Sequence, residues 1–259
     1  LTVPATKEVF FRWTELGAWS PVMRTHHGTK PNLEWSWEKD DETKAMWRRY
    51  TIEHVTLAPL FEALAKEASQ TGIPILRGLF FHYPGEDAAW TTRDEFLLGS
   101  SILVAPVVTA QTTKRSVWLP PGGWFPWTGG ARVEGGTQEV PAPLGEIPVF
   151  ARAGSILARY PDRIRTLDLS SPAVPGPAEI GDDRDVLAFL GGDATFTEVG
   201  GLSYALSGKT SASGAATYAW DGTSLGACAA TPVAPCVGPD EGTGAVARVS
   251  GNGTLTVTA

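Results

Sequence analysis

The chain has 259 residues, a formal net charge of −7, and 42% hydrophobic against 19% charged residues, a globular composition with room for one large or two to three small domains. The acidic balance and the scattered Lys and Arg residues argue against nucleic acid or an anionic membrane surface as a partner, and no stretch approaches the ~18 consecutive apolar residues of a membrane span. An uncharged substrate fits this composition better.

A first helix is predicted over residues 6–19, which read TKEVFFRWTELGAW. Apolar side chains recur there at Val9, Trp13 and Leu16, which is the spacing of an amphipathic helix. We expect the apolar face of this helix to be buried and its other face to be polar.

A long second helix is predicted from Asp40 or Asp41, either of which can cap its N-terminus, to Gly72, which can end it. Pro59 should kink or break this helix, because proline lacks a backbone donor and clashes with the preceding turn. The apolar run 73–84 then reads as a short strand. The order helix, glycine, strand is typical of an α/β unit.

The helical spacing of apolar residues ends at about Phe96. From there to Tyr160, short β-rich runs alternate with Gly and Pro turns. This pattern is typical of an antiparallel sandwich. The runs read SILVAPVV, RSVWLP, GGWFPW, RVEGGTQEVPA and IPVFARAGSILA. After Pro161 aromatic residues become sparse, and Gly, Ser, Thr and Ala dominate. We expect a second, weaker β domain there, with the alternating GTLTVTA as one of its strands.

The only two cysteines, Cys228 and Cys236, lie in a Pro/Gly-rich stretch. A disulfide between them would indicate an exported protein, so the expected location is extracellular or periplasmic. The alternative is a pair of unpaired thiols. The chain begins at Leu1 without a Met or a leader sequence, which we interpret as a cut rather than a natural start.

The segment PVMRTHHGTK, directly after the first predicted helix, concentrates polar groups that can handle protons or bind hydroxyls. Arg24 offers a fixed set of guanidinium donors, and a neutral imidazole at His26 can donate to one hydroxyl while accepting from another. In an α/β unit this segment lies on a loop, where such folds place substrate contacts. From residue types alone, an ordinary polar surface loop is the alternative.

A metal or cofactor site is not predicted. His26 and His27 are adjacent, so their side chains diverge, and no third ligand lies at zinc spacing. Neither a nucleophile-elbow motif nor a glycine-rich phosphate loop occurs.

A catalytic pair of carboxylates, one protonated acid and one carboxylate in a pocket as in glycosidases, is not predicted. Those in EWSWEKDDE read instead as a solvated turn and a helix cap, and those before the first β run as a turn at a domain junction. The candidate carboxylates are Glu34, Glu38, Asp40, Asp41, Asp94 and Glu95. None is predicted to be a catalyst.

Several blocks, in order, resemble glycoside hydrolase family 31, which includes α-glucosidases, α-xylosidases and sulfoquinovosidases. FFRWTELGAWSPVMRTHHG resembles the family's RW…LGAFSPFMRxH segment, and DEFLLGSSILVAPVV is similar to its DQFLLGxxLLVAPV junction. The blocks YTIEHVTLAPLFEALAKEASQTGIPILRGLFFHYP, RSVWLPPGGWFPWTGG and PLGEIPVFARAGSILAR also resemble the family's last barrel helix and strand and the turns of the sandwich that follows. The resemblance covers about residues 8–160.

The resemblance implies the terminal part of a (β/α)8 TIM barrel followed by antiparallel β-sandwich domains. The domains would be 1–90, the C-terminal part of the barrel; 91–161, a proximal β-sandwich; and 162–259, a linker with a distal β-rich domain.

By the same resemblance, Arg24 and His26 line the subsite that holds the sugar whose bond is cleaved. His27 falls where relatives vary. The family's two catalytic aspartates lie on earlier barrel strands, so they are expected outside this sequence. The parent protein would be a retaining α-glycosidase acting on α-glucoside-type substrates, with an oligosaccharide or glycoside as its partner and no cofactor, and this part alone would be inactive.

Two departures from the family stand out. Gly78 occupies a position where relatives often carry proline, which predicts lower local rigidity. The stretch HHGTKPNLEWSW is longer than the corresponding segment of many α-glucosidases, so the identity of the sugar stays open.

The alternative function is a non-catalytic β-sandwich module, which either has a purely structural role or binds carbohydrate through solvent-facing aromatic rings. The candidate rings are Trp118, Trp124, Phe125 and Trp127. A binding module needs at least two coplanar, exposed rings, whereas the enzyme interpretation predicts that these rings are buried in the core.

Overall fold

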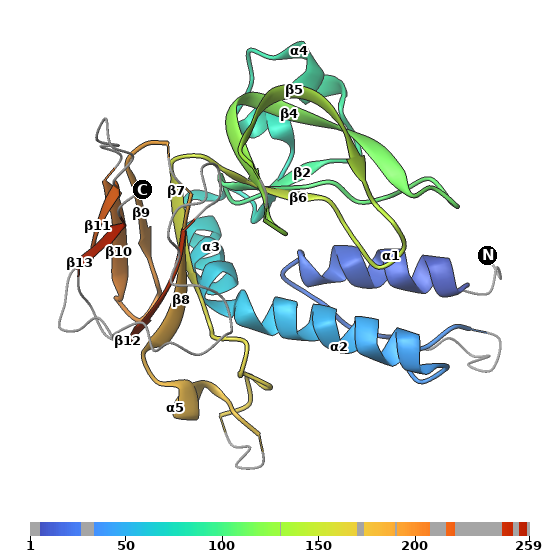
Figure 1. The fold of residues 1–259 in the computed structure, drawn as a ribbon, viewed down its shortest axis with the longest axis horizontal. Helices are drawn as coiled ribbons and strands as arrows, with labels where there is room; N and C mark the ends of the chain where they lie inside the picture. The colour runs from blue at the N-terminus through green and yellow to red at the C-terminus, as the bar shows by residue number, and fades with distance from the viewer. Residues whose placement is uncertain are drawn as a thin grey trace. The chain divides into compact units, whose positions relative to one another are not determined.

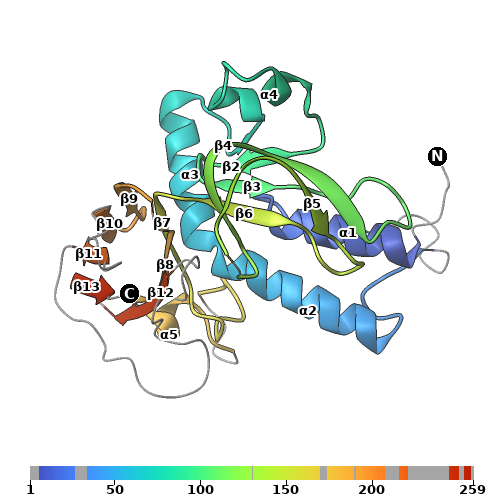
Figure 2. The ribbon, with the colours of Figure 1, turned by 45° about the horizontal axis from the view of Figure 1, so that its top comes forward.

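The computed structural model describes residues 6–26, 34–129, 131–169, 174–189, 191–207, 216–220, 245–250 and 254–257. Contacts between Cα atoms divide the chain into two compact units. The first unit contains residues 1–54, 76–120 and 136–149, and the second contains residues 55–75, 121–135 and 150–259. Figures 1 and 2 show the elements of both units.

Helix α1 (Lys7–Ala18) begins the first unit and confirms the helix predicted over residues 6–19. The hydroxyl of Thr6 caps it by accepting from the backbone N–H of Val9. Phe11 and Ala18 are buried, but Trp13, a member of the predicted apolar face, is 68% exposed. The spacing of apolar residues therefore predicted the helix correctly. It did not predict which face of the helix is buried in the described part of the chain.

The predicted long helix is divided into α2 (Asp41–Thr56) and α3 (Ala58–Thr71). The division falls at Leu57, so that Pro59 lies in the first turn of α3, where its missing N–H costs no intrahelical bond. Both predicted ends are confirmed. Asp40 accepts from the backbone N–H of Thr43, and Gly72 ends α3 in the left-handed conformation at φ 76°.

The apolar run after Gly72 forms a shorter strand than predicted. Strand β1 covers only Leu76–Arg77 and is followed by the 3-10 helix η2 (Leu79–Phe81) and the short helix α4 (Asp87–Thr91). Strand β1 pairs antiparallel with β2 (Phe96–Leu98), which pairs antiparallel with β3 (Ile102–Val104). The residues of β3 and most of β2 are buried and belong to the core.

The runs RSVWLP and GGWFPW form one strand, β4 (Lys114–Pro126), and not two strands separated by a turn. Gly122 has φ 116° within it, a conformation that glycine adopts without strain, so the chain passes through this position and stays extended. Strand β5 (Val133–Pro141) is exposed or half-buried at most positions, whereas the residues of β6 (Val149–Arg152) are mostly buried. Strands β4 and β6 pair antiparallel through Trp124–Pro126.

The second unit also contains two antiparallel sheets. One joins β7 (Ser155–Arg159), β8 (Asp183–Phe189) and β12 (Ala245–Ser250). The other has the order β13, β11, β10, β9, with bounds β9 (Ala194–Thr197), β10 (Ser203–Ser207), β11 (Ala216–Trp220) and β13 (Thr254–Val257). Helix α5 (Pro177–Ile180) precedes β8. These strands agree with the β-rich region predicted after Pro161, including the strand in GTLTVTA.

A buried ion pair lies in the second unit. The Arg184 guanidinium donates to both carboxylate oxygens of Glu198, and the Tyr204 hydroxyl donates to Glu198 Oε1 at 2.8 Å. The Tyr160 ring lies 4.5 Å from the guanidinium carbon. Because every member of this cluster has a partner, the charges of the pair are compensated where water is largely excluded.

The predicted fold class is confirmed as the terminal part of an α/β barrel followed by antiparallel β structure. The predicted domain boundaries at residues 90 and 161 stay predictions. Cys228 and Cys236 lie outside the described residues, so the disulfide also stays a prediction. Among the described residues, no helix is long and apolar enough to cross a membrane.

Candidate functional site

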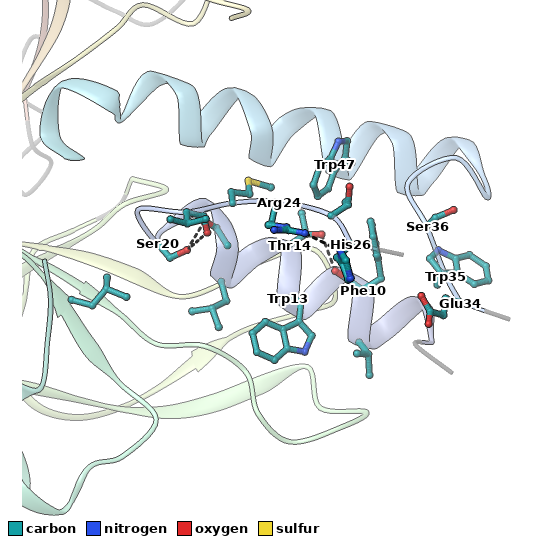
Figure 3. Close-up of a pocket in the computed structure, with 17 residues that line it drawn as sticks. Phe10, Trp13, Thr14, Ser20, Arg24, His26, Glu34, Trp35, Ser36 and Trp47 are labelled. Atoms are coloured by element: carbon teal, nitrogen blue, oxygen red, sulfur yellow. Dashed lines mark hydrogen bonds between the residues drawn. The ribbon is translucent and has the colours of Figure 1, made fainter. Parts of the chain in front are cut away.

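A hollow of about 510 Å³ lies in the first unit, between α1, α2 and the segment that follows α1 (Figure 3). Its lining includes Arg24 and His26, together with Leu76 of β1. This segment follows a helix and precedes another helix, which is the position of a barrel strand and its loop in an α/β unit. The hollow therefore brings residues of the segment after α1 together with residues of α1, α2 and β1.

Arg24 and His26 lie two positions apart in the segment after α1, which forms neither helix nor strand, and their side chains are in contact. Nη2 of Arg24 lies 2.8 Å from Nδ1 of His26. A guanidinium can only donate, so Nδ1 accepts this bond and the neutral ring carries its proton on Nε2. Both side chains are exposed, which leaves Nε2–H and the remaining guanidinium donors open to a ligand.

Aromatic side chains form much of the hollow's wall (Figure 3). The rings of Phe10 on α1 and Trp47 on α2 lie 5.8 Å apart. Trp35 also lines the hollow, and its indole N–H donates to the hydroxyl of Thr43 at 3.0 Å, which fixes its ring plane. Apolar walls with a few donors at the rim suit a ligand that has both an apolar face and hydroxyl groups.

The carboxylates nearest in sequence act as the predicted turn and cap. Asp40 caps α2 and accepts from Lys7 Nζ at 2.9 Å, and this bond to Lys7 lowers the pKa of Asp40 to about 2. Glu34 lines the hollow. A carboxylate held ionised by an ammonium group is a poor general acid at neutral pH, so Asp40 does not take that role.

Glu95, predicted to lie in a turn at a domain junction, is buried. Its Oε1 accepts from the backbone N–H of Trp118 at 2.9 Å and from Arg115 Nη2 at 3.2 Å. Burial raises the pKa of Glu95 to about 7, because it disfavours the charged form more than Arg115 and the Trp118 N–H favour it. Such a pKa can mark a catalytic acid. Glu95, however, does not line the hollow of Arg24 and His26. Its bonds join the residue before β2 to β4, so its role is structural.

The pKa of Glu95 predicts a pH dependence of stability. The folded-state pKa lies above the usual value of 4.5, so the stabilisation is complete below that value and is lost as the pH rises through about 7. We expect Glu95→Gln to reduce the fall in unfolding free energy between pH 5 and pH 8 by about 1–3 kcal/mol. Calorimetric melting at several pH values measures this, with Glu139→Gln in the exposed pair with Lys114 as the control. Equal pH slopes for wild type and Glu95→Gln would contradict it.

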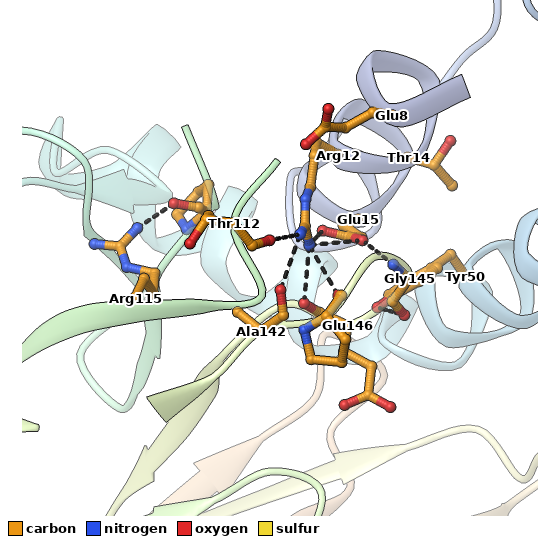
Figure 4. Close-up of polar contacts among 12 residues, drawn as sticks. Glu8, Arg12, Thr14, Glu15, Tyr50, Thr112, Arg115, Ala142, Gly145 and Glu146 are labelled. Carbon is orange, nitrogen blue, oxygen red and sulfur yellow. Dashed lines mark hydrogen bonds and ion pairs between the residues drawn. The ribbon is translucent and has the colours of Figure 1, made fainter. Parts of the chain in front are cut away.

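Two polar clusters in the first unit were not predicted from the sequence. Arg77, buried on β1, places Nη1 3.0 Å from Nε2 of His82, a second guanidinium–imidazole pair. Arg12 and Glu15 on α1 form a buried pair that also bonds the loop around Gly145 (Figure 4). Neither cluster carries a local sequence signal, because an isolated Arg or Glu in a helix or strand reads as exposed. Within the described part of the chain, no group of three or more His, Cys, Asp or Glu side chains could hold a metal ion.

Comparison with known protein families gives matches for two successive parts of the chain. Residues 2–64 match the TIM-barrel domain of glycosyl hydrolase family 31, and residues 72–157 match the C-terminal domain of the same family. Over these residues the chain belongs to glycosyl hydrolase family 31. The predicted resemblance is thereby confirmed, in the order barrel and then C-terminal domain.

Individual family 31 members cover the same region. A sulfoquinovosidase of Agrobacterium fabrum is 42% identical over 164 residues, 62% of this chain and 25% of that protein. The α-glucosidase 2 of Bacillus thermoamyloliquefaciens is 31% identical over 171 residues, 62% of this chain and 22% of that protein. The chain thus spans about a quarter of the length of these curated relatives.

A solved family 31 sulfoquinovosidase from E. rectale, in complex with an aza-sugar inhibitor, superposes with a TM-score of 0.55 at 32% identity. The match covers 59% of this chain and 23% of that chain. Arg24 and His26 themselves lie within residues 2–64, the part of the chain that matches the barrel domain of the family.

The rings named for the alternative binding module are not exposed. Trp124 and Phe125 are buried, and Trp118 and Trp127 are half-buried. In the second unit, Phe125 and Trp127 pack against Phe189, with ring centroids 5.9 and 6.1 Å away. These side chains contribute to packing, and the exposed pair of rings that a binding module requires is absent from this set.

Proposed function

We propose that the chain is the C-terminal part of a retaining α-glycosidase, and that Arg24 and His26 contribute to the subsite that holds the sugar whose bond is cleaved. The observation that carries the proposal is the match to the barrel and C-terminal domains of family 31, in order, by a chain that spans about a quarter of its glycosidase relatives. The geometry of the hollow is compatible with a sugar ligand.

In the proposed reaction the catalytic aspartates come from barrel strands that precede this sequence. One aspartate attacks the anomeric carbon and the other protonates the leaving oxygen, so that the glycosidic bond breaks as the glycosyl-enzyme bond forms. Water, deprotonated by the second aspartate, then releases the sugar with its configuration retained.

This chain would supply orientation and charge to that reaction. The Nε2–H of His26, free because Nδ1 accepts from Arg24, can donate to a sugar hydroxyl. The guanidinium of Arg24 can stabilise the ionised carboxylates beside it. Fixing the sugar between such donors and an apolar wall favours one reacting geometry.

The sugar itself is the open part of the proposal. Relatives of this chain are named sulfoquinovosidase and α-glucosidase, and the identity is higher to the sulfoquinovosidases. An α-linked glucose-type ring is common to both names. We therefore propose an α-glucoside-type substrate and test the sulfonated sugar beside the neutral one.

The test uses the longer protein that contains this chain. Purified protein should release 4-nitrophenol from 4-nitrophenyl α-glucoside or 4-nitrophenyl α-sulfoquinovoside, and NMR of the first product should show retained α configuration. A β product from the first turnover, or no hydrolysis of either compound, would reject the proposal. The ratio of kcat/KM values identifies the preferred sugar.

The 259-residue chain alone is expected to be inactive, because binding groups without a nucleophile and an acid leave no covalent route to cleavage. Incubation with both aryl α-glycosides, followed by absorbance of 4-nitrophenol, measures this. Turnover comparable to that of intact relatives would show that the catalytic pair lies within this sequence.

A further inference from the structure

Helix α1 ends directly before the segment that carries Arg24 and His26, and its last turn is tied to that segment. Oγ of Ser20 lies 3.0 Å from the carbonyl oxygen of Gly17 and 2.9 Å from that of Val22 (Figure 3). The backbone N–H of Ser20 also donates to the Gly17 carbonyl, at 3.1 Å. The start of the segment is therefore fixed against the end of the helix.

Gly17 lets the segment pass close to the helix. A Cβ atom at this position would lie 3.3 Å from Cγ of Met23, which is closer than most such contacts. Glycine weakens a helix relative to alanine, so the helix itself gains nothing from it. Met23 is the residue before Arg24, and its packing beside Gly17 places the backbone that carries the Arg24 side chain.

A histidine that does not line the hollow holds the same turn. His54, in the last turn of α2, places Nδ1 3.2 Å from the carbonyl oxygen of Ala18, the last residue of α1. A carbonyl oxygen only accepts, so Nδ1 carries the proton. Burial lowers the pKa of His54, and the bond to Ala18 opposes this only in part. The neutral ring therefore donates to one of the last helix carbonyls, which have no partner within the helix.

The segment after α1 depends on such contacts. Residues 22–26 belong to no helix or strand, so no regular pattern of backbone hydrogen bonds fixes their conformation. The three contacts made by Gly17, Ser20 and His54 all lie within seven residues of Arg24 in the sequence of α1 and its segment. We call Gly17, Ser20 and His54 the α1 clasp.

We propose that the α1 clasp positions the segment that carries Arg24 and His26, and thereby keeps their side chains in the contact of 2.8 Å. His54 is a positioning residue in this proposal, because it acts through a backbone carbonyl at the end of α1. An effect of the clasp on catalysis rests on the proposed function, whereas its effect on the Arg24–His26 contact requires no substrate.

The first measurement follows this contact without substrate, in the longer protein used for the glycosidase assay. Diethyl pyrocarbonate acylates an imidazole through a nitrogen lone pair, and the lone pair on Nδ1 of His26 accepts from Arg24. His54→Leu should release the segment, so that His26 reacts at least about 3-fold faster as the population with a free lone pair grows. Mass spectrometry of the peptide, with fragment ions that separate His26 from His27, gives the rate.

The second measurement is the split between kcat and KM in the same variant. We expect kcat for the preferred aryl α-glycoside to fall about 10-fold and KM to change less than about 3-fold, because a misplaced donor weakens the transition state more than the bound substrate. His54→Asn keeps a side-chain N–H close to the place of Nδ1 and should return kcat to within about 3-fold of wild type.

Tyr50→Phe is the matched control. Tyr50 lies on the same helix as His54, and its buried hydroxyl donates to the backbone carbonyl of Gly145 at 2.9 Å. Its loss removes a bond of the same kind, so both variants should lower the melting temperature by about 2–6 °C. In Tyr50→Phe, however, the acylation rate of His26 and kcat should stay within about 2-fold of wild type.

An unchanged acylation rate of His26 in His54→Leu, or an equal rise in Tyr50→Phe, would overturn the proposal. These rates are decisive even if the protein hydrolyses neither aryl glycoside, so failure of the proposed function is a separate result. Gly17→Val serves if His54→Leu does not fold. Valine is no worse than glycine in a helix, but its side chain displaces Met23 and should also speed acylation of His26. An unchanged rate in Gly17→Val would count equally against the proposal.

Discussion

Arg12→Met is expected to lower the free energy of unfolding by about 3–5 kcal/mol, the usual cost of removing one partner from a buried ion pair. Nη1 of Arg12 lies 3.0 Å from Oε2 of Glu15, and the Arg12 and Glu15 side chains are only 10% and 1% exposed (Figure 4). Methionine fills a similar volume but leaves the Glu15 carboxylate buried without its counter-charge. Burial already raises the pKa of Glu15, and Arg12 opposes that rise.

The same guanidinium also holds a loop in place. It donates to four backbone carbonyl groups, at distances of 2.9–3.2 Å. The acceptors are Thr112, Ala142, Pro143 and Glu146. Glu15 completes the arrangement by accepting from the N–H of Gly145 at 2.8 Å, and the hydroxyl of Tyr50 donates to the Gly145 carbonyl at 2.9 Å. Loss of Arg12 leaves several of these groups unsatisfied at once.

Urea denaturation measures the effect, and a double-mutant cycle identifies its origin. Arg12→Met combined with Glu15→Leu should lose less stability than the sum of the two single variants, because the double variant contains no unpaired buried charge. As a control, Lys44→Met removes a cation from an exposed i, i+3 pair with Asp41 and should change stability by less than about 0.5 kcal/mol. A loss below 1 kcal/mol in Arg12→Met, or strict additivity, would show that the pair contributes little.

The sequence predicted the elements whose signals are local. The division of the long helix follows from Pro59, its end from Gly72, and its cap from Asp40, and each of these acts within one helical turn. Family resemblance then supplied the barrel. Both kinds of inference depend on short, ordered stretches of sequence, so both were accessible without coordinates.

Interactions across long sequence separations were not accessible in the same way. Arg12 reads as a residue on the polar side of a helix, yet its carbonyl partners lie at least 100 residues away. Glu95 reads as part of a turn because nothing adjacent indicates that Arg115 and Trp118 will enclose it. Gly78 predicted only lower local rigidity. Nothing adjacent indicates that a Cβ atom at this position would lie 2.4 Å from Cε1 of the Phe80 ring. In each case tertiary packing determines the role.

The candidate site could be predicted from the sequence in part. Resemblance selected Arg24 and His26, and the structure adds the contact of 2.8 Å between their side chains. The aromatic wall could be predicted only in part. Trp13 belonged to the predicted apolar face of the first helix, but Trp47 and Trp35 join it from the second helix and from the segment before it.

His26→Ala in the complete enzyme is expected to lower kcat/KM by on the order of 10²-fold, through loss of an oriented donor to the sugar. Because His26 is exposed, its removal should change the stability of the protein by less than about 0.5 kcal/mol. A melting curve therefore distinguishes a role in sugar binding from a role in folding. His26→Gln, which keeps a side-chain N–H donor, should retain more activity than His26→Ala, and a near-wild-type rate for His26→Ala would reject the assignment.

The contact between Arg24 and His26 also predicts how the activity losses of the two single variants combine. If the guanidinium fixes the tautomer with the proton on Nε2, Arg24→Met removes both its own charge and the orientation of the imidazole. The double variant should then lose about as much activity as the more damaged single variant, because residues that act as one unit are not additive. Multiplicative losses would mean that the two side chains contact the sugar independently, and that the bond between them has no part in placing the proton.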